Sequence, residues 1–158
     1  MEEIVQILTL RNETISTMES ATGGFIANAI TNVEGASEVF SFGATTYSNF
    51  YKIKFGVSEE VIKKYSVYSM EVAHEMSSSI ANYTGSRYGI GITGKFNRED
   101  RFNHFGDNRV VYISVYDKIL DIYVDKVLTV TDKSREKNKE NVLYWVINLL
   151  KEILKEEE

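Results

Sequence analysis

The segment Thr17–Ala27, with the sequence TMESATGGFIA, decides how the first part of the chain folds. Residues 14–18 are rich in β-branched side chains, which predicts a short strand. Apolar residues then recur at helical spacing over residues 25–30, so we expect a helix that begins near Ala21 or Thr22. A strand that turns directly into a helix is the first sign of an alternating α/β chain.

Ser20 would lie at this turn, where the first backbone N–H groups of a helix have no partners within the helix. Those donors and the positive end of the helix dipole favour an anion or a developing oxyanion. Gly23 and Gly24 carry no Cβ, so a ligand can approach the backbone closely there. Taken alone, the stretch is better interpreted as a helix cap, because serine is a preferred N-cap residue. A catalytic role for Ser20 therefore needs evidence from other residues of the chain.

The composition is that of an ordinary globular protein, and we expect one domain over residues 1–158. The absence of cysteine excludes disulfides and thiolate metal sites and is compatible with a reducing cytoplasm. His74 and His104 have no second histidine at ligand spacing, so we expect no metal site. A net charge of −5 argues against a nucleic-acid partner. We expect no membrane partner, because the sequence has no bilayer-length apolar run and no signal-peptide pattern.

The remaining hydrophobic patterns extend the alternation of strands and helices. Further strands are expected over residues 39–47 (interrupted at Gly43), 88–93, 109–116 and 120–130, the last two forming a hairpin about Asp117-Lys118. Helices are expected over residues 2–12, from Ser58, from Ser69 and over residues 142–153. This order predicts helices packed on both faces of a mixed sheet.

Three stretches of the chain carry motifs that occur together in one known family. They are Glu19–Gly24 (ESATGG), Gly43–Ser58 with TYSNFYK inside it, and Gly91–Gly94 (GITG) followed by Val111–Ser114 (VYIS). Each motif is moderately specific, and their order and spacing across nearly the whole sequence make the match strong. The chain resembles the CinA C-terminal domain family, the competence/damage-inducible proteins that include the nicotinamide mononucleotide deamidases.

The resemblance implies a three-layer α/β/α domain with a mixed β-sheet that hydrolyses the carboxamide of nicotinamide mononucleotide, giving nicotinate mononucleotide and ammonia. It assigns the nucleophile to Ser20 and completes the catalytic set with Tyr47 and Lys52. The substrate contacts that it implies are Thr22, Gly23, Gly24, Asn49, Thr93, Gly94 and Arg135. It also implies a cytoplasmic homo-oligomer that needs neither cofactor nor metal and has a small-molecule nucleotide as its partner.

The chemistry of these residues is coherent with that activity. A serine hydroxyl is a weak nucleophile unless a base removes its proton, and a lysine does so when desolvation lowers its pKa. Tyr47 can relay that proton or position Lys52, and the amides near residues 22–24 can hold an oxyanion or a phosphate. Each residue also has an ordinary structural interpretation, as a strand-end tyrosine, a solvated lysine or a turn asparagine. Their joint occurrence in the family's order favours catalysis.

The segment Lys95–Asn108 departs from the family pattern, because it is charged and bulky where the family has a loop rich in glycine and proline. Its composition suggests a mobile lid. Its phenylalanines, Phe96, Phe102 and Phe105, are more commonly packed beneath such a loop as a small cluster. Lys139 also stands where the family has the second arginine of a pair opening the last helix, and lysine lacks the bidentate fork for phosphate.

Two alternative functions stay open at this point. The first is an amidase of the same chemistry with a different substrate, because the divergent loop would shape its pocket. The second is a non-catalytic, oligomeric nucleotide-binding or interaction module that kept the fold. The retained serine, tyrosine and lysine weigh against the second alternative, and the altered loop weighs for it.

Overall fold

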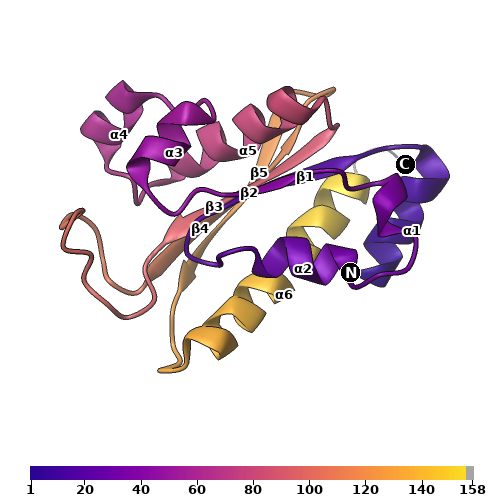
Figure 1. Cartoon of the computed structure of the whole chain (residues 1–158). Helices are drawn as coiled ribbons and strands as arrows, with labels where there is room; N and C mark the ends of the chain where they lie inside the picture. The colour runs from indigo at the N-terminus through magenta and orange to yellow at the C-terminus, as the bar shows by residue number, and fades with distance from the viewer. Residues whose placement is uncertain (156–158) are drawn as a thin grey trace.

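In the computed structural model, which describes residues 1–155, five strands form one mixed sheet (Figure 1). The strands are β1 (Ile15–Glu19), β2 (Gly43–Thr45), β3 (Tyr88–Gly94), β4 (Val110–Asp117) and β5 (Ile122–Thr129), in the spatial order β2-β1-β3-β4-β5. β1 pairs in parallel with β2 and β3, whereas β4 and β5 are antiparallel to their neighbours. The carboxyl ends of β1, β2 and β3 therefore meet at one edge of the sheet.

Six α-helices cover the two faces of the sheet and make the predicted three layers (Figure 1). One face carries α1 (Glu2–Arg11), α2 (Phe25–Thr31) and α6 (Arg135–Lys155). The other carries α3 (Asn49–Lys54), α4 (Glu59–Tyr65) and α5 (Met70–Thr84). The chain thus passes from one face to the other after β2, which is where open α/β sheets form ligand sites at their strand ends.

The central strands are buried on both sides, which is why their sequences do not alternate between apolar and polar residues. Every residue of β1 and β3 is buried. Two glycines of β3 let α5 approach its backbone closely. A Cβ at Gly89 would lie 2.0 Å from the Ser77 carbonyl oxygen, and one at Gly91 would lie 2.3 Å from that of Ala73. The strand Tyr88–Gly94 accordingly agrees with the predicted strand over residues 88–93.

The predicted start of the second helix is wrong by a few residues. α2 begins at Phe25 and not at Ala21 or Thr22. The reason is the glycine pair, because Gly23 and Gly24 have φ angles of +62° and +97°, which interrupt a right-handed helix. A tight turn over residues 21–24 therefore separates Ser20 from the helix.

The predicted strand over residues 39–47 is also wrong in its extent, because only Gly43–Thr45 pairs with β1. A short 3-10 helix, Ala36–Glu38, occupies the chain just before this region. Gly43 is required at the pairing, since a Cβ there would lie 2.4 Å from the Thr17 hydroxyl oxygen. The predicted hairpin is confirmed, but Asp117 is the last residue of β4 and pairs with Ile122, so the turn spans residues 118–121.

The segment between β3 and β4 extends beyond the edge of the sheet, on the side of α4 (Figure 1). Phe96, at its start, is 4% exposed and joins the main apolar core. Phe102 and Phe105 are 81% and 79% exposed, so the predicted cluster beneath the loop is right for Phe96 and wrong for the other two.

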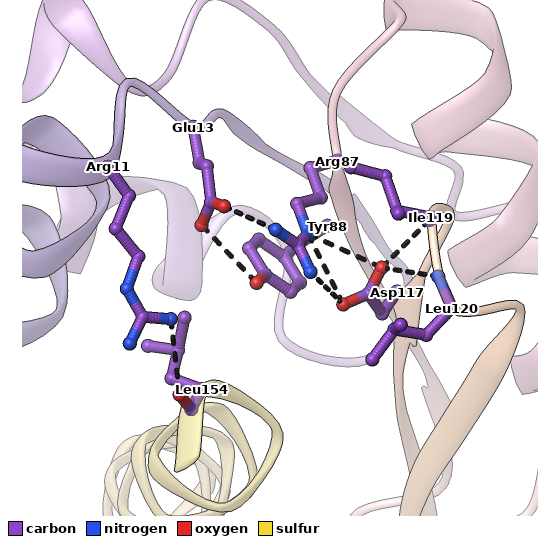
Figure 2. A network of polar contacts seen from close by, with 8 residues as sticks. All are labelled: Arg11, Glu13, Arg87, Tyr88, Asp117, Ile119, Leu120 and Leu154. Atoms are coloured by element: carbon purple, nitrogen blue, oxygen red, sulfur yellow. Dashed lines mark hydrogen bonds and ion pairs between the residues drawn. The ribbon is translucent and has the colours of Figure 1, made fainter. Parts of the chain in front are cut away.

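At the opposite edge of the sheet, a network of ion pairs ties the strand ends together (Figure 2). The Arg87 guanidinium pairs with Asp117 at 2.9 Å and with Glu13. Asp117 also accepts hydrogen bonds from the backbone N–H groups of Ile119 and Leu120 at 2.8 and 3.1 Å. These contacts stabilise the arrangement of the strand ends at this edge of the sheet.

Candidate active site

Ser20 lies at the carboxyl edge of the sheet, directly after β1. Its backbone N–H donates to the Ile92 carbonyl at 3.0 Å, which continues the pairing of β1 with β3. The Glu19 carbonyl accepts a hydrogen bond from Thr46 N at 2.9 Å, which fixes the end of β2 beside the serine. Ser20 is 7% exposed. The two strand ends therefore hold the serine in a fixed place.

Lys52 reaches Ser20 from α3, 32 residues further along the chain. Its Nζ donates to Ser20 Oγ at 3.0 Å and to the Thr46 carbonyl at 2.7 Å. The lysine is only 2% exposed. Ser48 caps this short helix by accepting a hydrogen bond from Tyr51 N. This cap fixes the start of the helix, so that Lys52 points toward the ends of β1 and β2. The structure thus brings together the predicted nucleophile and the predicted base.

Burial lowers the pKa of Lys52 to about 8, and the carboxylate of Asp100 opposes this shift. The two hydrogen-bond acceptors of Nζ, a hydroxyl and a carbonyl, are both neutral. A lysine in this environment is partly unprotonated near neutral pH, as a general base must be. The Ser20–Lys52 pair therefore has both the contact and the electrostatics that proton transfer needs.

The lowered pKa of Lys52 predicts how the free energy of unfolding depends on pH. Between pH 8 and pH 10.5 the unfolded chain keeps a proton on Lys52 that the folded chain has lost, so the free energy of unfolding rises with pH. The cost of the buried ammonium is present in full below pH 8 and disappears above pH 10.5. Relative to Lys52→Met, the wild type is expected to gain up to about 3 kcal/mol across this range, measured by chemical denaturation.

The matched control for this experiment is Lys54→Met, which removes an exposed lysine from the same helix. Its unfolding free energy is expected to follow that of the wild type at every pH. Parallel curves for the wild type and Lys52→Met would contradict the lowered pKa.

Glu19, which the sequence analysis left without a role, caps the turn and helix that follow Ser20. Its buried carboxylate accepts hydrogen bonds from the Thr22 hydroxyl at 2.7 Å, from Ile26 N at 2.9 Å and from Ala27 N at 3.0 Å. The first amides of α2 are therefore occupied and do not face a ligand. The position of this carboxylate just before a helix start is the feature of the sequence from which the role could have been predicted.

The turn after Ser20 retains unpaired amides. Gly23 N donates to the Ser20 carbonyl at 3.0 Å, and Phe25 N donates to the Thr22 carbonyl. The N–H groups of Ala21, Thr22 and Gly24 have no acceptor among the described residues. The turn, and not the helix, thus supplies the donors that an oxyanion or a phosphate would use.

The start of α6 carries two basic side chains, Lys139 beside this glycine turn and Arg135 against Tyr47. The Lys139 Nζ lies 3.7 Å from the place where a Cβ of Gly23 would be. Arg135 donates from Nη2 to the Tyr47 hydroxyl at 3.4 Å, and its guanidinium lies 5.4 Å from the centre of the Phe96 ring. This cluster of two cations and a glycine turn suits an anionic group.

Tyr47 lies on the open side of the site and is 66% exposed. Among residues 1–155, Arg135 is the hydrogen-bond partner of its hydroxyl, which does not bond to Ser20 or Lys52. Of the three residues assigned to catalysis, the structure therefore brings Ser20 and Lys52 into contact and leaves Tyr47 facing the cationic cluster.

The other expected substrate contacts are built into the scaffold. Thr93 is fully buried and donates to the Val67 carbonyl at 2.9 Å, and Gly94 is crowded by Val110 and Val111 of β4. Asn49 donates from Nδ2 to Asn103 Oδ1 at 2.9 Å, which ties α3 to the β3–β4 loop. Neither Thr93 nor Asn49 can turn its side chain toward a ligand without losing its contact.

The β3–β4 loop brings a carboxylate to the site that no motif indicated. Asp100 Oδ2 accepts hydrogen bonds from the Tyr68 hydroxyl at 2.5 Å and from Asn103 Nδ2 at 3.0 Å, and Oδ1 accepts from Phe102 N at 2.9 Å. Burial opposes the shift, but these bonds lower the pKa of Asp100 to about 2. Burial and the same carboxylate raise the pKa of the Tyr68 phenol. Asp100 is therefore ionised at neutral pH.

Two structural absences apply to the part of the chain that is described. Across residues 1–155, no three or more His, Asp or Glu side chains gather in a way that would hold a metal ion. No helix in that same part is both long and apolar enough to cross a membrane.

The CinA C-terminal domain family model matches residues 1–154. A Clostridium botulinum (strain Langeland) protein that bears the name competence-damage inducible is 48% identical over 94 residues, which are 59% of this chain and 23% of that protein. A CinA-like protein of Kosmotoga olearia is 46% identical over 94 residues, again 59% and 23% of the two chains. The match thus spans less than a quarter of the length of these curated relatives.

Solved structures of CinA superfamily proteins have the same fold. The protein from Klebsiella pneumoniae 700603 superposes with a TM-score of 0.88 at 21% identity, over 98% of this chain and 95% of that one. The protein from Escherichia coli superposes with a TM-score of 0.85 at 22% identity, over 96% and 89%. The fold agrees with these structures and the family match covers nearly every residue, so this chain belongs to the CinA C-terminal domain family.

Proposed function

We propose that this chain is an amidohydrolase that converts nicotinamide mononucleotide to nicotinate mononucleotide and ammonia. The observation that carries the proposal is the 3.0 Å contact between the Lys52 Nζ and Ser20 Oγ, in a buried setting that lowers the pKa of the lysine. A hydroxyl in contact with a base of this kind is the arrangement that acyl transfer from an amide requires. The resemblance of the motifs supplies the substrate class.

In the proposed reaction, neutral Lys52 takes the proton of Ser20 as Oγ attacks the carboxamide carbon. The unpaired amides of the turn at Ala21 and Gly24 stabilise the oxyanion that develops. The Lys52 ammonium then gives its proton to the departing nitrogen, which leaves as ammonia with an ester on Ser20. A water molecule, activated by the same lysine, hydrolyses this ester and restores the hydroxyl.

The charges around the site favour one orientation of the bound nucleotide. Lys139 lies beside the glycine turn that follows Ser20 and Arg135 contacts the Tyr47 hydroxyl, whereas the ionised Asp100 acts on Lys52 from the loop. A phosphate is attracted to the cationic side and repelled by the carboxylate. We therefore assign the phosphate to Arg135 and Lys139, with the Tyr47 hydroxyl between the phosphate and the reacting amide.

This assignment predicts the effect of Arg135→Ala. The Michaelis constant for nicotinamide mononucleotide is expected to rise about tenfold, because a charge-assisted phosphate contact is lost. The effect should vanish with nicotinamide riboside, which has no phosphate. Lys137→Ala, which removes an exposed cation from the same helix, is the matched control and should leave the constant unchanged. An equal rise for both substrates would contradict the phosphate assignment.

The proposed function is tested by ammonia release from purified protein. We expect turnover with nicotinamide mononucleotide and much slower turnover with the riboside, free nicotinamide or glutamine. Preference for another linear amide would favour a related amidase with a different substrate, and no release from any amide would favour a non-catalytic nucleotide-binding module. Either result would overturn the proposal.

The proposed setting is pyridine-nucleotide salvage in the cytoplasm, and a homo-oligomer is the expected assembly. β5 supports the expectation of a homo-oligomer, because it is an edge strand whose outer backbone groups are open to pairing. Val127 of this strand is 54% exposed. Sedimentation of the purified protein measures the assembly directly.

A further inference from the structure

The β3–β4 loop carries one charged group that acts on the proposed base. The groups that contact Lys52 from the ends of β1 and β2 are the Ser20 hydroxyl and the Thr46 carbonyl, which are neutral. From the loop, the Asp100 carboxylate is the charge that favours the ammonium form of the lysine. Tyr68 donates a hydrogen bond to this carboxylate, and Tyr47 acts on Tyr68. Lys95 is a further charged group beside Tyr68, with its Nζ 4.8 Å from the centre of the Tyr68 ring.

We propose that Asp100 is a positioning residue for Lys52, whose fixed carboxylate stabilises the ammonium that forms when Lys52 takes the proton of Ser20. The inference rests on the proposed function of the Ser20–Lys52 pair. It adds a part of the site that lies outside the recognised motifs, in the segment that departs from the family pattern.

The carboxylate is held from three sides, so its position does not depend on the loop alone. Tyr68, which precedes α5, and Asn103 both donate to Oδ2, and the backbone of Phe102 donates to Oδ1. Asn103 in turn accepts a hydrogen bond from Asn49, the first residue of the helix that carries Lys52. The carboxylate is therefore anchored to the start of the helix that carries Lys52 through a chain of hydrogen bonds.

This arrangement has a specific energetic consequence. Burial alone would make Lys52 a weak base, since the interior disfavours the ammonium. A nearby fixed negative charge restores part of the basicity, which increases the driving force for proton removal from the serine. Loss of the charge should therefore do two opposite things: extend activity to lower pH and reduce the maximal rate.

The test is Asp100→Asn, with Asp107→Asn as the matched control. Asparagine keeps the size of the side chain and one of its two acceptor oxygens, so this change removes the charge together with part of the anchoring. Asp107 lies in the same loop and pairs with Arg109, so its change removes the same charge away from Lys52. The titration of Lys52 is followed by the carbon-13 shift of its Cε, assigned by the signal missing from Lys52→Met. The rate of ammonia release is measured over the same pH range.

In Asp100→Asn we expect the Lys52 titration and the acid limb of the rate profile to move together to lower pH, while the maximal rate falls about threefold or more. Asp107→Asn should leave both unchanged. Tyr68→Phe, which keeps the charge and removes one anchor, should give a smaller shift in the same direction.

A Lys52 titration that is equal in Asp100→Asn and Asp107→Asn would overturn the inference, as would a fall in rate without any shift. The carbon-13 titration needs no substrate. Absence of amide hydrolysis in the wild type would therefore refute the proposed function, and the titration would still decide whether Asp100 acts on Lys52.

Discussion

Ser20→Ala is expected to reduce ammonia release from nicotinamide mononucleotide by at least about a thousandfold, because removal of a catalytic nucleophile has effects of this size or larger. The chain should stay folded. The hydroxyl of Ser20 makes one hydrogen bond, with Lys52, and the lysine keeps its bond to the Thr46 carbonyl, so the loss of stability should be about 1 kcal/mol. Substrate affinity, measured by calorimetry, should change little, since the phosphate contacts lie elsewhere.

The matched control is Ser86→Ala. Ser86 is a buried serine that bonds to Thr84, close to the start of β3 at the opposite edge of the sheet. Its replacement should cost a similar amount of stability and leave the rate unchanged. An alanine variant at position 20 that keeps more than about a tenth of the wild-type rate would rule out Ser20 as the nucleophile.

Lys52→Arg is expected to be almost inactive, with a rate near that of Lys52→Met, although it keeps the positive charge. Arginine is not deprotonated in proteins, so it cannot take the proton of Ser20. Its guanidinium is also larger than the ammonium in a place that is 2% exposed, and a lower melting temperature should accompany the loss of rate. Rates are compared after the folded fraction of each variant is measured by circular dichroism.

Lys54→Arg, on the exposed side of the same helix, is the control and should be fully active. The opposite result for Lys52→Arg would indicate a different role for the lysine. If Lys52 served only to attract a phosphate, arginine would preserve most of the rate and methionine would lose it. That pattern would contradict the role of Lys52 as a general base.

Local sequence patterns predicted most of the fold because they act over short distances. The β-branched run before Ser20 gave a strand close to β1. The apolar face over residues 142–153 gave the last helix, but α6 already begins at Arg135, in a polar stretch without that apolar pattern. The start of α2 was misplaced because helical spacing does not reveal the positive φ angles of Gly23 and Gly24. The strand before Tyr47 was overextended because pairing at a sheet edge depends on the neighbouring strand and not on β propensity.

The site residues likewise divide into those that motifs indicated and those that depend on contacts between distant segments. Ser20 and Lys52 were found because both belong to motifs, and their contact across 32 residues follows from the parallel strands that bring their segments to one edge. Asp100 and Tyr68 were missed because their contact joins two segments that carry no motif. Glu19 was part of a motif, but its role depends on how the turn after Ser20 folds back onto it.

The central claim is that neutral Lys52 removes the proton of Ser20, and the dependence of kcat/KM on pH tests it most directly, because this quantity reports ionisations of the free enzyme. The profile for nicotinamide mononucleotide is measured beside the carbon-13 titration of Lys52 in the same buffers. We expect kcat/KM to rise through one ionisation at a pH of about 8 that coincides with the titration of Lys52. A rise at a different pH from that titration, or a Lys52 that titrates near 10.5 in the folded protein, would contradict the account.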